Sequence, residues 1–185
     1  HVHLDHIYGN AVFKKDGTDF IGHIDLPKAM LARKEFYERT NLRYLKTPPE
    51  ESILIAPNIL IKANESKNFD LGNRIIKITG YPISHTNTDI TVEDIKTKTL
   101  WAGDLLFIER LPSIDGDIHG YIAVIDEILK LDFDLVIPGH GTPTQKWKEA
   151  FIKERNYLKI LRDEIRAAID NDQDLQLTIE TAAQS

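Results

Sequence analysis

Apolar residues recur along this chain at two different spacings, which predict an alternation of helices and strands. Residues 26–40 carry an approximate apolar stripe with Pro27 in the first turn, and this pattern predicts a helix capped by Asp25. Residues 117–130 and 144–169 repeat apolar side chains at helical spacing. They predict two further amphipathic helices, of which the second is the longer.

Short apolar runs between these segments predict strands. The runs lie at residues 59–61, 74–79, 89–92, 99–102 and 134–137. A polar turn around residues 94–97 separates two of the runs and predicts a hairpin. The two prolines within residues 47–51 predict a loop that interrupts regular structure without dividing the chain. The mixed order of elements predicts one α/β domain over residues 1–185.

Composition narrows the class of protein. The chain has 185 residues, 42% apolar and 28% charged, which is typical of one folded domain and argues against disorder. The net charge is −6 and no basic patch is present, which excludes a nucleic-acid binder that relies on phosphate contacts. The apolar runs are too short for a membrane span. Cysteine is absent, which excludes disulfides, iron–sulfur clusters and a cysteine nucleophile and leaves the compartment open.

The first six residues concentrate three imidazoles and one carboxylate, in the order His1, His3, Asp5 and His6. Imidazole nitrogens and carboxylate oxygens are the ligand set of zinc. His1 and His3 are two residues apart, so in an extended segment they project from one side. Asp5 and His6 face a second position, and one short segment therefore supplies ligands for two metals. The alternative is a histidine-rich terminus, such as the remnant of a tag.

Three more candidate ligands follow predicted strands. His85 lies in the turn-rich stretch 80–89, Asp104 follows a glycine at a strand end, and His140 lies between Gly139 and Gly141. Each alone is more often a turn residue than a ligand. Together with the first segment they form four clusters in order. The predicted metal ligands are therefore His1, His3, Asp5, His6, His85, Asp104 and His140.

These motifs together resemble a known superfamily. HVHLDH, the histidine of ISHTNTD, the aspartate of WAGD and the histidine of PGHG resemble the metallo-β-lactamase superfamily of dinuclear zinc hydrolases, over residues 1–141. Within it, LWAGDLLFIERLPSIDGDIHGYI and LDFDLVIPGHG resemble the quinoprotein relay system zinc metallohydrolases, which are related to β-lactamases and to glyoxalase-II-like thioesterases. The resemblance implies a four-layer αβ/βα sandwich. The first sheet of that fold normally begins before the HVHLDH motif, so the chain is expected to lack N-terminal strands.

The resemblance also implies a role for each ligand. One zinc would be held by His1, His3 and His85, and the other by Asp5, His6 and His140, with Asp104 bridging the two. An aspartate at position 104 matches the glyoxalase-like and nuclease-like branches, whereas the best-known lactamase branch has a cysteine there. Two zinc ions that share a hydroxide supply a nucleophile near neutral pH. Asp5 is the candidate to accept the proton of the attacking water.

The expected activity is hydrolysis of an ester, thioester or lactam-type bond in a small-molecule substrate. Alternatives are a β-lactamase, a non-catalytic metal-binding accessory module of a quinoprotein system, and a folded fragment without metal. The resemblance implies export to a bacterial periplasm, and without it a cytoplasmic location is equally open. An incomplete first sheet would leave edges exposed, so oligomers are possible.

Residues near the motifs have less specific readings. Asp89 and Thr86 either hydrogen-bond the ligand imidazoles or cap a turn. Residues 115–117 predict a turn followed by a helix N-cap. His23 and His119 match no metal motif and are expected to be structural or surface residues.

Overall fold

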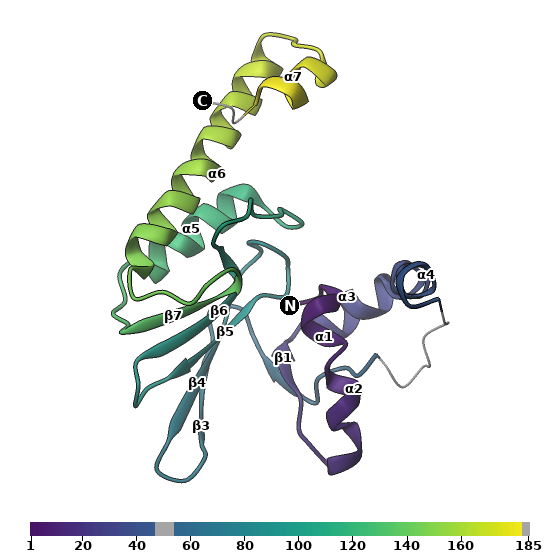
Figure 1. Ribbon diagram of the computed structural model, residues 1–185, viewed down its shortest axis with the longest axis vertical. Helices are drawn as coiled ribbons and strands as arrows, with labels where there is room; N and C mark the ends of the chain where they lie inside the picture. Colours follow the sequence, from purple (N-terminus) through teal and green to yellow (C-terminus); the bar gives the residue numbers. More distant parts are fainter. Residues whose placement is uncertain (47–53, 183–185) are drawn as a thin grey trace.

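A five-stranded sheet forms one half of the molecule in a computed structural model that describes residues 1–46 and 54–182 (Figure 1). Its strands are β3 (Ser66–Asp70), β4 (Ile75–Gly80), β5 (Ile90–Asp94), β6 (Thr99–Phe107) and β7 (Leu135–His140), in that spatial order. Strands β3 to β6 pair antiparallel, and β7 pairs parallel to β6. The predicted loop at residues 47–51 lies outside the described residues.

The predicted hairpin is confirmed, and Asp94 explains why the chain turns there. Val92 pairs with Trp101 and Asp94 with Thr99 across β5 and β6. The buried Asp94 carboxylate accepts hydrogen bonds from the Thr97 hydroxyl (2.6 Å) and the Lys96 amide (3.1 Å). An aspartate that bonds backbone two residues ahead holds a turn of this kind.

Two helices cover the outer face of this sheet, α5 (Ile118–Ile128) and α6 (Trp147–Asp170). Both predicted helices are confirmed, because their apolar stripes pack on the strands. The core that they bury includes Leu100, Leu105, Leu106, Tyr121, Ile125, Ile128, Val136, Phe151 and Leu158. Asp117 caps α5 by accepting from the Gly120 amide (2.7 Å), which confirms the predicted N-cap. The C-terminal half of α6 projects beyond the sheet, with α7 (Leu175–Thr181) at its end (Figure 1).

The other half contains a two-stranded parallel sheet and the N-terminal helices. Strand β1 (Ile21–His23) pairs with β2 (Ile59–Ile61). The helical segments are α1 (Leu4–Ile7), α2 (Asn10–Phe13), a 3₁₀ turn η1 (Lys14–Asp16), α3 (Leu26–Ala32) and α4 (Lys34–Leu45). Figure 1 shows these helices beside β1, on the opposite side of the five-stranded sheet from α5 and α6. Their core contains Val2, Ile7, Leu26, Ala29, Met30 and Tyr37.

One predicted helix differs in detail from the structure. Residues 26–40 do not form one helix, because the backbone leaves helical geometry at Arg33 (φ −100°, ψ 6°) and divides it into α3 and α4. Pro27 lies in the first turn as predicted, but the side chain of Asp25 makes no capping hydrogen bond.

The two sheets approach each other closely at Gly80. Ala63, just after β2, forms an isolated bridge with Gly80 at the end of β4. A Cβ at Gly80 would lie 2.4 Å from the Lys62 carbonyl oxygen, so only glycine permits this approach. The result is a mixed α/β fold with sheets inside and helices outside, as expected. Among the described helices, none combines the length and apolar character needed to cross a bilayer.

Candidate metal centre

The opening segment changes from extended to helical within six residues, and this change divides its side chains between two positions. Val2 is fully buried, and its carbonyl oxygen accepts a hydrogen bond from the Tyr37 hydroxyl (2.7 Å). Because side chains alternate along an extended segment, His1 and His3 face away from that core. Helix α1 then begins at Leu4, and its first turn carries Asp5 and His6 in another direction.

The first group of candidate ligands joins the opening segment to the loop after β4. The Nε2 atoms of His1 and His85 each lie 3.1 Å from Nδ1 of His3. Both Nε2 atoms also lie 3.4 Å from Oδ2 of Asp104. Three imidazole nitrogens and one carboxylate oxygen therefore meet at one point, although the sequence separates His3 from His85 by 82 positions.

The second group lies on the other side of the same carboxylate. Oδ2 of Asp5 is 3.2 Å from Nε2 of His140 and 3.6 Å from Nε2 of His6. Nε2 of His6 lies 3.1 Å from Oδ1 of Asp104, and Nε2 of His140 lies 3.5 Å from Oδ2. Asp104 is thus shared by the two groups, and the structure brings together all seven residues that the sequence singled out.

A network centred on Asp89 holds the loop that carries His85. The Asp89 carboxylate accepts from the Ser84 hydroxyl (2.7 Å), the Thr86 amide (2.7 Å) and the Thr86 hydroxyl (2.8 Å). The ring of His85 is oriented separately, because its Nδ1 lies 2.8 Å from the Ser113 carbonyl oxygen. Of the two readings of Asp89 and Thr86, the structure therefore supports the turn-capping one.

Two glycines at the strand ends leave space for the ligands that follow them. Gly103 has φ +55°, a conformation that favours glycine, directly before Asp104. A Cβ at Gly139 would lie 1.9 Å from Oδ1 of Asp104. Since β7 lies against β6, the carboxylate occupies the space that any larger residue at 139 would need. The glycine before His140 is therefore required by Asp104.

Asp115 belongs to the centre, a role that sequence reasoning missed. The turn reading of this residue is wrong in that its Oδ2 lies 3.1 Å from Nε2 of His3 and accepts from the Arg33 guanidinium (2.5 Å). Arg33 stands where α3 passes into α4, so the contact joins the two halves of the molecule. No local pattern identifies Asp115, because its partner lies 112 positions away in the sequence.

Burial and mutual contact set the charges of the centre. Burial raises the pKa of Asp104, but the adjacent His6 and His85 rings outweigh it and hold that pKa below its usual value. Burial is also the largest influence on His85 and lowers its pKa, yet the neighbouring Asp104 carboxylate leaves the net pKa raised. The pKa of His3 is lowered, chiefly by burial. A buried carboxylate amid imidazoles thus stays ionised, as a cation ligand must be.

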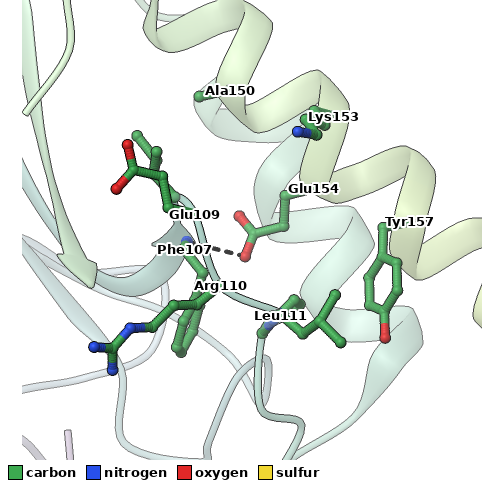
Figure 2. Close-up of a pocket in the computed structure, with 10 residues that line it drawn as sticks. Phe107, Glu109, Arg110, Leu111, Ala150, Lys153, Glu154 and Tyr157 are labelled. Atoms are coloured by element: carbon green, nitrogen blue, oxygen red, sulfur yellow. Dashed lines mark hydrogen bonds between the residues drawn. The ribbon is translucent and has the colours of Figure 1, made fainter. Parts of the chain in front are cut away.

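The centre is closed below and open above. The side chains of His85 and Asp104 are sealed, at 0% and 2% exposed. His3, His6 and His140 are about a quarter exposed, at 26%, 22% and 25%, and Asp5 is 56% exposed. A pocket of about 410 Å³ lies elsewhere, between residues 107–112 and α6, and none of the seven candidate ligands lines it (Figure 2).

The other unassigned histidine that the structure clarifies is His23. It is buried at 2% exposed in β1, and its Nδ1 accepts from the Asp25 amide (3.2 Å). It is absent from both ligand groups. The expectation that His23 is structural is therefore confirmed.

Known structures share this fold at low sequence identity. A sec-alkylsulfatase from Pseudomonas sp. superposes with a TM-score of 0.71 and 16% identity, covering 92% of this chain. A metallo-beta-lactamase from Pontibacter korlensis gives 0.61 and 14% over 86% of this chain, and a family member from Thermus thermophilus gives 0.63 and 15% over 90%. This chain spans 33%, 66% and 62% of their respective lengths.

Sequence comparison adds the family. Among curated proteins, none matches this chain. The sequence profile of the metallo-beta-lactamase superfamily, however, matches residues 1–140, which contain every candidate ligand. By fold, by sequence profile and by the order of its histidines and aspartates, this chain belongs to the metallo-beta-lactamase superfamily.

Proposed function

We propose that this protein is a dinuclear zinc-dependent hydrolase. The observation that carries the proposal is the pair of ligand groups that share Asp104. His1, His3 and His85 would hold one ion, and Asp5, His6 and His140 the other. The membership of the chain in a superfamily of generally hydrolytic metalloenzymes supports this assignment.

The residues fit such a pair of ions. Three imidazole nitrogens within 3.1 Å of each other cannot all donate hydrogen bonds, so their lone pairs are best satisfied by a cation. Oδ1 of Asp104 is sealed from water and lacks a hydrogen-bond partner among the described residues. A buried carboxylate oxygen without a partner is costly, and an ion would remove that cost. Nitrogen and oxygen donors without cysteine match zinc in a hydrolytic site.

Within the proposed mechanism, each residue has a separate task. Two bound ions lower the pKa of water towards 7 and polarise the substrate oxygen. Asp104 fixes the spacing of the two groups, and Asp5 takes up the proton of the attacking water because it is the most exposed carboxylate of the centre. The imidazoles of His3, His6 and His140 form the solvent-facing side where a substrate enters.

The substrate class follows less directly. We favour an ester or thioester of a small molecule, with a β-lactam as the second choice. An aspartate at position 104, where the best-known lactamases have cysteine, supports this order. The segment from Leu100 to Ile122 supports placement in the quinoprotein relay subfamily.

A non-catalytic accessory module is the alternative from another class. A purely structural metal site is normally closed by its protein ligands, whereas a catalytic site keeps an open position. The exposure of His6, His140 and Asp5 supports the catalytic reading.

The test is metal content combined with chelator-sensitive hydrolysis. The protein is loaded with Zn²⁺, its bound metal is counted, and ester, thioester, lactam and phosphodiester probes are assayed before and after chelation. We expect two equivalents of zinc and activity on at least one probe that Asp104→Asn abolishes. Less than one tightly bound equivalent, with no activity on any probe, contradicts the proposal.

A further inference from the structure

One buried carboxyl lies outside the seven ligands and is not used by the proposed mechanism. Glu154 on α6 is only 5% exposed. Its Oε1 accepts hydrogen bonds from the Phe107 amide (3.1 Å) and from the Tyr121 hydroxyl (3.1 Å). Burial in apolar surroundings raises the pKa of Glu154 to about 8. Because a carboxyl in such a place destabilises the fold, its presence calls for a function.

The first partner of Glu154 leads directly to two candidate ligands. Tyr121 on α5 is fully buried, and its hydroxyl also lies 2.6 Å from the backbone carbonyl oxygen of Asp104. Its ring packs edge-on against the ring of His85, with centroids 5.9 Å apart. Tyr121 therefore supports the shared carboxylate from behind and one imidazole from the side.

The second partner leads to the remaining ligand on this side. The ring of Phe107 stacks on the ring of His140, with centroids 5.1 Å apart and planes 20° apart. It also contacts the ring of His85 at 5.6 Å. Figure 2 shows the Glu154 carboxyl pointing from α6 to the backbone of Phe107, so this carboxyl fixes the height at which the Phe107 ring meets His140.

The strand itself does not fix this region. The pairing of β6 with β7 shifts register between Trp101 and Gly103 and again between Gly103 and Phe107. Asp104 lies within the irregular stretch. Where a ladder is interrupted, backbone groups need other partners. The Glu154–Tyr121 pair supplies them at both ends of the segment from Asp104 to Phe107.

We propose that Glu154 is the positioning residue for the β6–β7 side of the metal centre, acting through Tyr121 and Phe107 on His85, Asp104 and His140. The proposal rests on the proposed dinuclear site, because the geometry that Glu154 sets matters for ions bound there. Glu154 touches no reacting atom. Its effect is on how well the three ligands are held.

The experiment compares Glu154→Leu, Glu154→Gln and Tyr121→Phe after chelation and reloading with Co²⁺, whose visible absorption reports ligand geometry. Gln keeps an acceptor oxygen for both donors, whereas Leu removes it. For Glu154→Leu we expect the affinity for Co²⁺ to fall about 10–100-fold, the usual cost of losing an outer partner of a metal ligand. The absorption spectrum should change as well. Tyr121→Phe should move both readouts in the same direction, and Glu154→Gln should restore the wild-type spectrum.

A matched control separates positioning from stability. Ile128 is fully buried in the same core, about two turns further along α5 than Tyr121. Ile128→Ala should lower the melting temperature and leave Co²⁺ affinity and spectrum unchanged. Wild-type affinity and spectrum in Glu154→Leu, or an equal loss in Ile128→Ala, overturns the positioning role. A wild-type protein that binds no Co²⁺ refutes the metal centre itself, and with it any role of Glu154 there.

Discussion

Gly139 offers a sharp test of the geometry of the centre, because one added methyl group would enter the space of the shared carboxylate. In Gly139→Ala the new Cβ would lie 1.9 Å from Oδ1 of Asp104, which is 1.5 Å short of the 3.4 Å of ordinary contact (3.4 − 1.9). Rotation of the Asp104 side chain does not relieve the clash. The Cβ would also lie 2.7 Å from the Gly103 carbonyl carbon and 2.8 Å from the Asp104 amide nitrogen.

The expected result has two parts. Overpacking of this kind costs about 1–3 kcal/mol of unfolding free energy, or roughly 2–12 °C in melting temperature for a chain of this size. Because the displaced group is the one that both ion positions share, affinity for Co²⁺ should fall at least about 10–100-fold, the cost of disturbing even an outer partner.

The assay is Co²⁺ titration of chelated protein, followed by absorption, with thermal unfolding of the same samples. Gly9→Ala is the control, since a Cβ at Gly9 meets nothing within 4 Å and its backbone is helical (φ −59°). The control should match the wild type in both measurements. If Gly139→Ala binds two equivalents with wild-type affinity, Asp104 does not occupy the shared position and the reasoning is wrong.

Three further predictions test other parts of the site. Asp115→Ala should weaken Co²⁺ binding about 10–100-fold, because it frees the ring of His3; unchanged affinity in a titration contradicts this. In metal-free protein, the pKa of Glu154 is raised from 4.5 to about 8, so the folded state holds a proton that the unfolded state releases. The wild type should therefore lose stability relative to Glu154→Gln as pH rises from about 5 to 8, by up to about 1.4 kcal/mol per unit in urea unfolding, and parallel curves rule this out. Chelation of the metal-loaded protein should lower its unfolding free energy by about 4 kcal/mol at a free zinc level of 1,000 times Kd, measured by urea unfolding with and without chelator.

Helices with a strong apolar stripe and the hairpin were predictable from the chain. Helices α5 and α6 and the β5–β6 hairpin depend on side-chain periods and turn residues within a few positions of one another. Strand β3 was missed because it has a single large apolar residue, Phe69, and β1 because it is only three residues long. The break at Arg33 was also missed, since Arg33 is held by the distant Asp115.

The seven candidate ligands could be selected from sequence because imidazoles and carboxylates followed strand ends in a recognisable order. What supports them could not. Asp115 reaches His3 across 112 positions, and Glu154 reaches the strand of Asp104 across 47. Neither residue has a local pattern that separates it from a turn aspartate or a surface glutamate.

The sequence alone therefore determined which groups are available for chemistry and where regular structure begins, because both depend on residue type and on neighbours along the chain. Only the tertiary structure decided that Asp104 is shared by both groups, that Gly139 must be glycine, and that a buried glutamate supports the centre. These features arise when strands and helices distant in sequence pack against one another, and the distances between their side chains exist only after that packing.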